Sequence, residues 1–268
     1  MKLKNVIMML TLFPLMSLAS CKSSSEDLLT KIVSSKTLKV ATEATYSPFE
    51  YTDKNGNIVG FDVDIVSLVV DKIETQYDVE LSVQWTDQSF DGLIGSLQTG
   101  KADLVAAAMT VTDERASQVS FSDSYFTTST TVLVKAATPT SMDDLKKLKC
   151  GAQLGTVQAD YISDTTEGWN ANNMIVTSVA DLSLALESNQ IDAIVIEVPV
   201  AKTILAKYSD IKEITAIDFK DSSSFALATQ KDNSESFVSL INEVLTDAKS
   251  TGKIDTMYND ALNKATAN

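Results

Sequence analysis

The chain has 268 residues, with 36 acidic side chains against 22 basic ones, no histidine, a formal net charge of -14 and a pI near 4.4. This length allows one large domain or two small ones, each able to bury a core. An acidic chain without a basic cluster excludes nucleic acid as a partner, because phosphate contacts need stripes of Lys and Arg. The lack of histidine removes Ser-His-Asp and Cys-His catalysis and the commonest metal ligand. This counts against an enzyme but does not close the question, since enzymes without histidine exist; we expect no metal or cofactor.

The N-terminal segment has the pattern of a targeting signal. Two lysines precede an apolar run, residues 6–18, that is too short to cross a bilayer as a folded anchor. The run ends in Leu18-Ala19-Ser20-Cys21, which resembles the lipobox of bacterial lipoproteins. That resemblance implies a signal peptide over residues 1–20 and acylation of Cys21, with residues 21–35 as a lipidated tether and first helix. We therefore expect a lipid anchor in the bacterial cell envelope; the alternative is a chance cysteine after a secretory signal.

Strand-like and helix-like segments alternate through the remaining chain, which is typical of an α/β fold. Predicted strands cover 38–41, 81–85, 102–105, 125–134, 149–153, 174–179, 212–217 and 225–229. Predicted helices begin near 28, 62, 93, 113, 142, 157 and 182, and two long amphipathic helices close the chain at about 235–249 and 253–264.

One stretch of the chain occurs twice. Residues 97–105 and 186–194 share a helix end, a residue that tolerates the left-handed conformation, a polar residue, and an Asp that opens a buried strand. At the same offset, Ala108 in the first copy corresponds to Glu197 in the second. The copies predict that both positions lie at the carboxyl ends of equivalent strands, where α/β sheets bind ligands.

The two copies offer opposite charges at these strand ends. In the first, Thr112 can cap a short helix whose first turn holds Arg115, and this guanidinium and Thr110 suit a carboxylate. In the second, Glu197 suits a cation. A small molecule with one carboxylate and one ammonium would be held between them. The alternatives are a surface arginine after a strand and an ordinary charge at a helix N-terminus for Glu197.

Six motifs taken together resemble a known family, the extracytoplasmic solute-binding proteins of ABC transporters, specifically the polar amino-acid group. The resemblance covers about residues 36–264. The motifs are Ala41-Thr42-Glu43-Ala44-Thr45-Tyr46-Ser47-Pro48-Phe49-Glu50, Gly60-Phe61-Asp62-Val63-Asp64, Leu97-Gln98-Thr99-Gly100-Lys101-Ala102-Asp103, Met109-Thr110-Val111-Thr112-Asp113-Glu114-Arg115, Phe121-Ser122-Asp123-Ser124-Tyr125 and Gly155-Thr156.

The resemblance implies a two-lobed type II periplasmic-binding-protein fold with two crossing hinge strands. Lobe 1 would take residues 36–130 plus 226–268, and lobe 2 residues 131–225 with hinge strands at its ends. The position of Arg115 would bind the ligand α-carboxylate, and Glu197 the α-ammonium. The other implied contacts are Thr110 and backbone groups at Ala108 and Met109 in lobe 1, and Gly155, Thr156 and Val157 in lobe 2. Many relatives have Asp where this chain has Glu197, which is one methylene longer.

The resemblance also assigns the residues around the ligand side chain. Tyr46 and Phe90 match positions whose rings sandwich it, and Glu43 lies beside them. An aromatic pair with an acid suits a guanidinium or ammonium group, so we expect a cationic amino acid, with arginine ahead of lysine, ornithine or histidine. If the two rings are core residues and Glu43 is a solvated acid, glutamine or another polar amino acid would fit as well.

The expected action is capture of a free L-amino acid by lobe closure, followed by delivery from a monomer to an ABC permease and ATPase complex. The rival from another class is a cyclohexadienyl (prephenate or arogenate) dehydratase, which resembles the same family. Such enzymes add an acid inside the pocket, whereas Val198-Pro199-Val200-Ala201 after Glu197 has no second carboxylate. A sensory input domain of this fold would need a following transmembrane helix and signalling module, so we expect transport.

Overall fold

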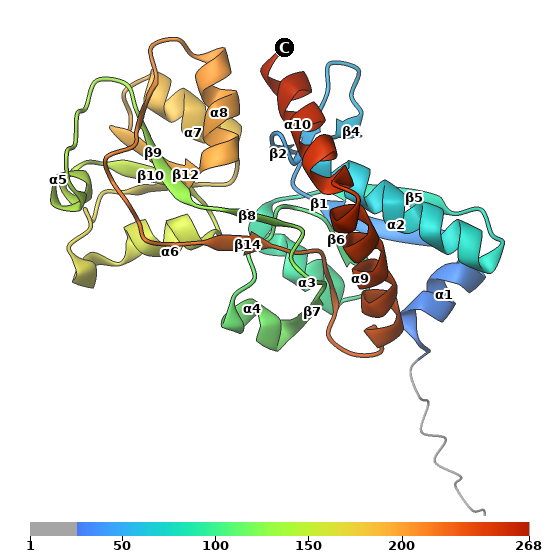
Figure 1. The fold of residues 1–268 in the computed structure, drawn as a ribbon. Coiled ribbons are helices and arrows are strands. Elements are labelled where there is room, and N and C mark those ends of the chain that lie inside the picture. The colour runs from blue at the N-terminus through green and yellow to red at the C-terminus, as the bar shows by residue number, and fades with distance from the viewer. Residues whose placement is uncertain (1–25, 268) are drawn as a thin grey trace, which may run out of the picture.

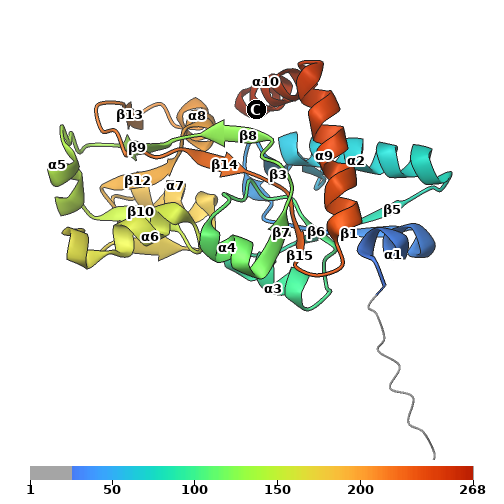
Figure 2. The same cartoon turned by 60° about the horizontal axis from the view of Figure 1, so that its bottom comes forward.

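The structure, a computed structural model, describes residues 26–267 (Figure 1). The predicted signal peptide over residues 1–20 and the predicted lipidation site at Cys21 lie outside the described residues. Two α/β lobes lie side by side and are joined by the paired crossing strands β8 (Phe126–Thr128) and β14 (Ser223–Phe225), as Figure 2 shows. Among residues 26–267, none of the helices combines the length and the hydrophobicity that a transmembrane span requires.

Lobe 1 contains a five-stranded mixed sheet in the order β5-β1-β6-β15-β7. Strand β1 runs parallel to β5 and β6, whereas β15 runs antiparallel to β6 and β7. The strands are β1 (Thr37–Thr42), β5 (Ser82–Asp87), β6 (Leu104–Val105), β7 (Val119–Phe121) and β15 (Ala228–Gln230), with a small second sheet of β2 (Thr45–Tyr46), β3 (Glu50–Thr52) and β4 (Ile58–Val59). The helices are α1 (Leu28–Ser35), α2 (Phe61–Tyr77), η1 (Phe90–Gly92), α3 (Leu93–Gln98), α4 (Asp113–Gln118), α9 (Glu235–Ser250) and α10 (Lys253–Thr266).

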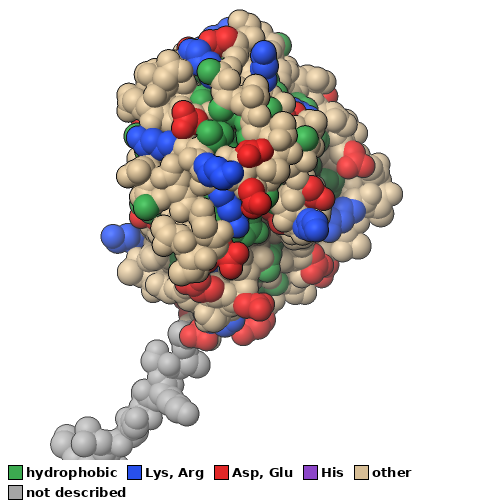
Figure 3. Space-filling view, turned by 90° about the vertical axis from the view of Figure 1, so that its left-hand side faces the viewer, with side chains coloured by type: hydrophobic (Ala, Val, Ile, Leu, Met, Phe, Trp, Pro, Cys, Tyr) green, Lys and Arg blue, Asp and Glu red, His purple; other side chains and the backbone are tan. Residues whose placement is uncertain are grey.

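Lobe 2 contains a second five-stranded sheet in the order β11-β10-β12-β9-β13. Its strands are β9 (Thr130–Val134), β10 (Cys150–Gln153), β11 (Met174–Val176), β12 (Ala193–Glu197) and β13 (Lys212–Ile214). Its helices are α5 (Met142–Lys147), α6 (Val157–Ser163), η2 (Thr165–Glu167), α7 (Val179–Glu187) and α8 (Val198–Lys207). On the face of the molecule seen in Figure 3, acidic and basic side chains are interspersed and do not gather into a basic stripe.

The repeated stretch forms the same local structure in both lobes. Gly100 and Asn189 adopt positive φ values of 67° and 55° at the ends of α3 and α7. Asp103 then accepts a bond from the Lys39 backbone N–H at 3.1 Å and returns its own N–H to the Lys39 carbonyl at 2.9 Å. Asp192 makes the same pair of bonds to Lys149, at 2.9 and 2.8 Å. Each Asp therefore ties the strand that it precedes to a parallel neighbour, and the predicted equivalence of the two copies is confirmed at this point.

Two segments predicted as single strands are each divided between two strands in the structure. The segment 125–134 is one strand in the prediction but breaks at Ser129 into β8 and β9, because β8 pairs with β14 at the crossing while β9 enters the lobe 2 sheet. The segment 225–229 likewise divides, because β14 pairs at the crossing and β15 in the lobe 1 sheet. In each segment the partner strand changes at the boundary between the lobes. Strand propensity is a local property of the residues, so it does not predict a change of partner.

The hinge strands rest on an aromatic cluster that belongs mostly to lobe 1. Phe126 of β8 lies 4.5 Å from the ring of Tyr258 on α10 and 6.1 Å from Phe225 of β14. Phe49 packs edge-on against Phe126 and Phe225 at 5.3 and 5.2 Å. Buried aromatic pairs of this kind stabilise their surroundings beyond the area they bury. The lobe 1 end of the crossing strands is therefore firmly anchored.

Candidate ligand site

A central pocket lies where the two lobes meet, at the carboxyl ends of β6, β10 and β12. Its lining residues come from both lobes: Tyr46, Phe90, Ala107, Ala108, Thr110 and Arg115 from lobe 1, and Gln153, Thr156, Val157 and Glu197 from lobe 2. The cavity volume is only about 10 Å³, which is room for about one water molecule. The lobes are therefore closed at this pocket, and their own side chains fill it.

On the lobe 1 side, the pocket is bounded by the end of β6, where the side chains are small. After β6 the chain continues as three buried alanines, residues 106–108, and Ala108 adopts φ +44°. This left-handed conformation is uncommon for a residue with a Cβ and points to a functional constraint. The Ala108 N–H donates to Oδ2 of the buried Asp62 at 2.8 Å, and the Tyr125 hydroxyl donates to the same oxygen at 2.6 Å. Asp62 thus fixes the backbone that faces the pocket.

Arg115 bridges the two lobes. Thr112 caps α4 by accepting the Arg115 backbone N–H, which confirms the predicted helix start. The guanidinium donates through Nη1 to the Thr110 carbonyl at 2.6 Å and through Nη2 to the Gly155 carbonyl of lobe 2 at 2.7 Å, and it lies 5.2 Å from the Phe90 ring centre. A guanidinium has five N–H donors, so these two bonds leave capacity for a carboxylate. Burial lowers the pKa of Arg115, but an arginine in a protein stays charged.

Glu197 is the acidic counterpart on lobe 2. It is the last residue of β12, it immediately precedes α8, whose first turn contains Pro199, and it is 3% exposed. Its carboxylate accepts a hydrogen bond from the Tyr46 hydroxyl of lobe 1. Burial raises the pKa of Glu197, while hydrogen bonds from Tyr46 and Gln158 and the charge of Arg115 act in the opposite direction. A guanidinium and a carboxylate therefore face one pocket from opposite lobes.

Two further oxygen atoms beside the pocket are buried without a hydrogen-bond donor among the described residues. One is Oε2 of Glu43, whose other oxygen accepts the Thr45 hydroxyl at 2.6 Å. The second is Oε1 of Gln153, whose amide N–H donates to the Thr177 carbonyl at 3.1 Å. Glu43 is only 4% exposed and burial raises its pKa, so the alternative that it is a solvated acid is wrong. Buried polar atoms in proteins nearly always have partners, so these two acceptors suit a ligand that brings donors.

The structure brings most of the predicted site residues together. Eight of them line the central pocket: Tyr46, Phe90, Ala108, Thr110, Arg115, Thr156, Val157 and Glu197. Glu43 lies beside it, and Gly155 supplies the carbonyl that Arg115 contacts. Met109 is 1% exposed, its side chain packs in the lobe 1 core, and its carbonyl accepts the Ala226 N–H. Its side chain therefore does not belong to the pocket, although the resemblance implied only a backbone contact there.

Sequence reasoning missed Ala107 and Gln153. Gln153 is the last residue of β10, so the strand-end rule that selected Ala108 and Glu197 would also have selected it. Ala107 has no functional group, and nothing in its chemistry separates it from a core alanine. Within residues 26–267, no group of three or more cysteine or acidic side chains is arranged to hold a metal ion.

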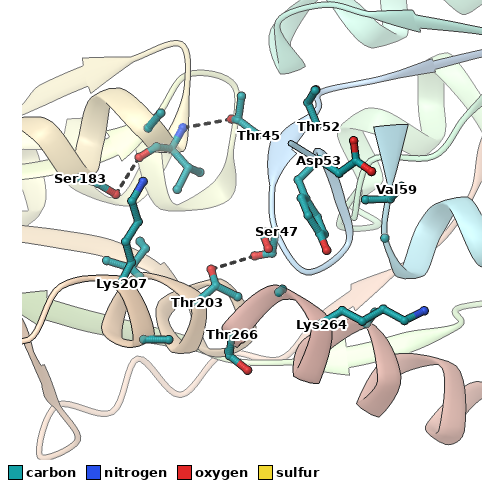
Figure 4. A pocket seen from close by; sticks show the side chains of 18 of the residues that line it. Thr45, Ser47, Thr52, Asp53, Val59, Ser183, Thr203, Lys207, Lys264 and Thr266 are labelled. Atoms are coloured by element: carbon teal, nitrogen blue, oxygen red, sulfur yellow. Dashed lines mark hydrogen bonds between the residues drawn. The ribbon is translucent and has the colours of Figure 1, made fainter. Parts of the chain in front are cut away.

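The lobes also touch at two places outside the central pocket. At the first, a Cβ built on Gly155 would lie 3.1 Å from the Cα and Cβ of Asp91 of lobe 1. The second is a side groove of about 980 Å³ between β2–β4 and α10 of lobe 1 and α7 and α8 of lobe 2 (Figure 4). There the Thr203 hydroxyl donates to the Ser47 carbonyl at 3.3 Å, and the Val179 N–H donates to the Thr45 hydroxyl at 3.4 Å. These contacts add to the closing of the two lobes.

Two α/β lobes, a pair of crossing strands and opposite charges facing each other across a closed interlobe pocket define a hinged binding protein for small charged molecules. Residues 38–264 match the family described as bacterial extracellular solute-binding proteins, family 3, and the chain belongs to that family. The resemblance inferred from the motifs is thereby confirmed.

Curated relatives and solved structures agree with this placement. The chain is 32% identical to a probable histidine-binding protein of Campylobacter jejuni, with 82% of this chain and 83% of that protein covered. It is 30% identical to the arginine-binding extracellular protein ArtP of Bacillus subtilis, with coverage of 91% and 90%. The structure superposes on that of the amino acid ABC transporter substrate-binding protein AbpA of Streptococcus pneumoniae bound to L-arginine, with a TM-score of 0.79, 30% identity, and coverage of 88% of this chain and 98% of that one. The predicted two-lobed α/β fold is confirmed.

Proposed function

We propose that this protein is the amino-acid-binding component of an ABC importer and that its ligand is a cationic amino acid, with arginine preferred. Arg115 and Thr110 bind the α-carboxylate, Glu197 binds the α-ammonium, and Glu43 and Gln153 receive the side-chain cation between the rings of Tyr46 and Phe90. The observation that carries this proposal is the charge balance of the pocket region: one guanidinium, Arg115, stands against two buried acids, Glu43 and Glu197.

The charge balance separates cationic from neutral ligands. An isolated buried charge costs several kcal/mol unless it is paired. A zwitterion with an uncharged side chain pairs with Arg115 and Glu197 and leaves Glu43 without a partner for Oε2. A guanidinium or ammonium side chain pairs with that third charge. The similarity to a probable histidine-binding protein, an arginine-binding protein and an arginine-bound structure supports the same class of ligand.

Ligand capture requires the lobes to separate and close again. A cavity of about 10 Å³ cannot admit an amino acid, and the contacts that close it join Tyr46 to Glu197 and Arg115 to Gly155. We take the moving bodies to be residues 36–130 plus 226–268 and residues 131–225, which rotate about β8 and β14. A ligand that binds both walls shifts the population toward the closed form.

The setting proposed for this action is the outer side of the bacterial membrane. A monomer, held by a lipid on Cys21, would deliver its ligand to a permease and ATPase complex. Membership of an extracellular family supports the location. We propose no enzyme activity, since the turn that follows Glu197 begins α8 with apolar residues and carries no second acid.

The test is calorimetric titration and thermal unfolding of the chain from residue 22 onward with arginine, lysine, ornithine, histidine and glutamine. Arginine at 100 times its dissociation constant should raise the melting temperature by roughly 5–10 °C. Glutamine should bind at least about tenfold more weakly, and Glu43→Gln should shrink that difference by about tenfold because it removes the third charge. Glu80→Gln, at an exposed site on the same lobe, is the matched control.

Two outcomes contradict the proposal. Tighter binding of glutamine than of arginine would exclude a cationic ligand. Conversion of prephenate or arogenate by the purified protein would replace binding with catalysis.

A further inference from the structure

Glu50 is a fully buried acid that the ligand contacts described above do not use. It begins β3, where it pairs across the small sheet with Tyr46 of β2, and its exposed fraction is 0%. Both of its carboxyl oxygens lack a donor among the described residues. Since a buried carboxylate normally accepts several hydrogen bonds, this position does not fit an ionised group.

The side chain of Asp62 is the complementary case. Asp62 lies in the first turn of α2 and is also 0% exposed. Its Oδ2 accepts the Ala108 N–H and the Tyr125 hydroxyl, which is the environment of a carboxylate, yet its Oδ1 has no partner among the described residues. The Asp62 backbone N–H donates to the carbonyl of Phe49, the residue before Glu50, at 2.8 Å, so the two acids are adjacent. Asp62 has one oxygen and Glu50 has two without a hydrogen-bond partner among the described residues.

Three nearby acids make ionisation of Glu50 unfavourable, and no basic side chain within residues 26–267 contributes to its electrostatic surroundings. Asp62 on α2, Glu43 after β1 and Glu197 on β12 each act on Glu50 with negative charge. The hydroxyls of Tyr46 on β2 and Tyr125 before β8 are already donated to Glu197 and Asp62. From α10, Tyr258 packs against the rings of Phe49 and Phe61, and Asp64 of α2 interacts with Lys264 and Asp260. Burial and these acids raise the pKa of Glu50 well above its usual value, and burial raises the pKa of Asp62 to about 6.

We propose that Glu50 is protonated in the folded protein and donates its O–H to Oδ1 of Asp62, so that the two buried carboxyl groups share one proton. A single proton then satisfies both residues. The O–H of Glu50 finds an acceptor, and the Asp62 carboxylate is held by three donors, from Glu50, Ala108 and Tyr125. Hydrogen bonds in which one partner is charged are shorter and stronger than neutral ones.

The shared proton has a role in ligand binding, although Glu50 does not line the pocket. It fixes Asp62, Asp62 fixes the backbone of Ala108 at φ +44°, and that backbone faces the place where the ligand carboxylate would lie. Glu50 is therefore a positioning residue for the carboxylate end of the pocket. This role rests on the proposed amino-acid site but not on which side chain the ligand carries.

The proton gives stability a defined pH dependence. An unfolded Glu releases its proton near pH 4.5, whereas folded Glu50 retains it to a much higher pH. The contribution to stability is therefore full below the unfolded pKa and is lost as pH rises through the folded pKa. Glu50→Gln replaces the O–H donor by an amide N–H that cannot ionise, so it should keep the hydrogen bond to Asp62 and remove the pH dependence.

The experiment compares the melting temperatures of the wild type, Glu50→Gln and the exposed control Glu80→Gln between about pH 5 and pH 9, together with ligand affinity at pH 7. The melting temperature of the wild type should fall relative to Glu50→Gln by roughly 3 °C for each pH unit over the range in which only the folded protein retains the proton. Glu80→Gln should follow the wild type. The affinity of Glu50→Gln should stay within about threefold of the wild type, and that of Glu50→Ala should fall by about tenfold.

Infrared spectroscopy keeps the proposal testable if Glu50→Ala does not fold. The wild type at pH 7 should show the C=O stretch of a protonated carboxyl group, and the difference spectrum against Glu50→Gln should contain that band. If the band is missing, or if the melting temperatures of wild type and Glu50→Gln run parallel with pH, Glu50 is ionised and the shared proton is refuted. If Glu50→Ala binds ligand like the wild type, the positioning role is refuted even where the proton is present. Loss of ligand binding by the wild type itself would instead contradict the proposed function.

Discussion

Strand β6 in lobe 1 and strand β12 in lobe 2 are preceded by the same local structure but are followed by side chains of opposite charge. In both, a residue at positive φ ends a helix and an Asp ties the new strand to its parallel neighbour. Past β6 the chain runs through small residues to α4 and Arg115, whereas β12 ends directly in Glu197 at the start of α8. The shared part builds a strand end, and the few residues after it decide whether that end attracts an anion or a cation.

Removing the lobe 1 charge should have the largest effect on binding. Arg115→Ala deletes the guanidinium that bridges Thr110 and Gly155 and leaves the ligand carboxylate without its cation. Breaking a buried charge pair costs roughly 3–5 kcal/mol, so affinity should fall at least about 100-fold in calorimetric titration. The exposed Lys202→Ala is the matched control, and binding by Arg115→Ala within tenfold of the wild type would show that the carboxylate lies elsewhere.

Neutralising the lobe 2 charge should come next. Glu197→Gln keeps the side-chain shape and an acceptor for the Tyr46 hydroxyl but removes the charge that faces the α-ammonium. A hydrogen bond to a charged group contributes about 2 kcal/mol, so we expect roughly 30-fold weaker binding, measured in the same titration. Equal affinity in Glu197→Gln and in the control Glu80→Gln would mean that the two strand ends are not a matched pair.

A substitution that prevents full closure of the lobes should have a smaller effect on ligand affinity. Gly155→Ala places a Cβ about 3.1 Å from the backbone of Asp91 and strains a residue at φ +79°, so closure should remain incomplete. We expect roughly tenfold weaker binding and a larger radius of gyration in small-angle scattering with ligand present. Gly168→Ala provides the control, because Gly168 also has a positive φ (+87°) but has no atom within 4 Å of an added Cβ. A ligand-bound Gly155→Ala protein as compact as the wild type would contradict this account of closure.

Asp103 and Asp192, which occupy equivalent positions in the two lobes, should affect stability rather than ligand affinity. Asp103→Ala removes a buried acceptor from the Lys39 N–H and a 3.1 Å ion pair with Lys31, so unfolding in urea should become easier by about 2–3 kcal/mol. Asp192→Ala removes the matching bond to Lys149 at an exposed site and should cost about 1 kcal/mol. Ligand affinity should stay within about threefold in both. A large loss of affinity in either variant would mean that the repeated stretch does more than build the strand ends.

The sequence by itself determined the elements whose signals are local. The helix caps at Thr112 and Thr156, the left-handed residues Gly100 and Asn189, and the two closing helices all follow from nearby residues. The sequence also contained the repeat that placed Ala108 and Glu197 at equivalent strand ends. These features could be predicted because capping bonds, positive φ and amphipathic spacing involve residues only a few positions apart.

Only the tertiary structure decided what depends on partners distant in the chain. The break at Ser129 arises because β8 and β9 join different sheets, and the burial of Glu43, which is 4% exposed, is a property of the folded chain that its local sequence does not record. Sequence patterns identified Asp62 as a helix opener, but its bonds to Ala108 and Tyr125 join residues 46 and 63 positions away. Charge, burial and hydrogen bonding at the site are properties of such long-range contacts, and a single sequence records the residue types without recording which of them meet.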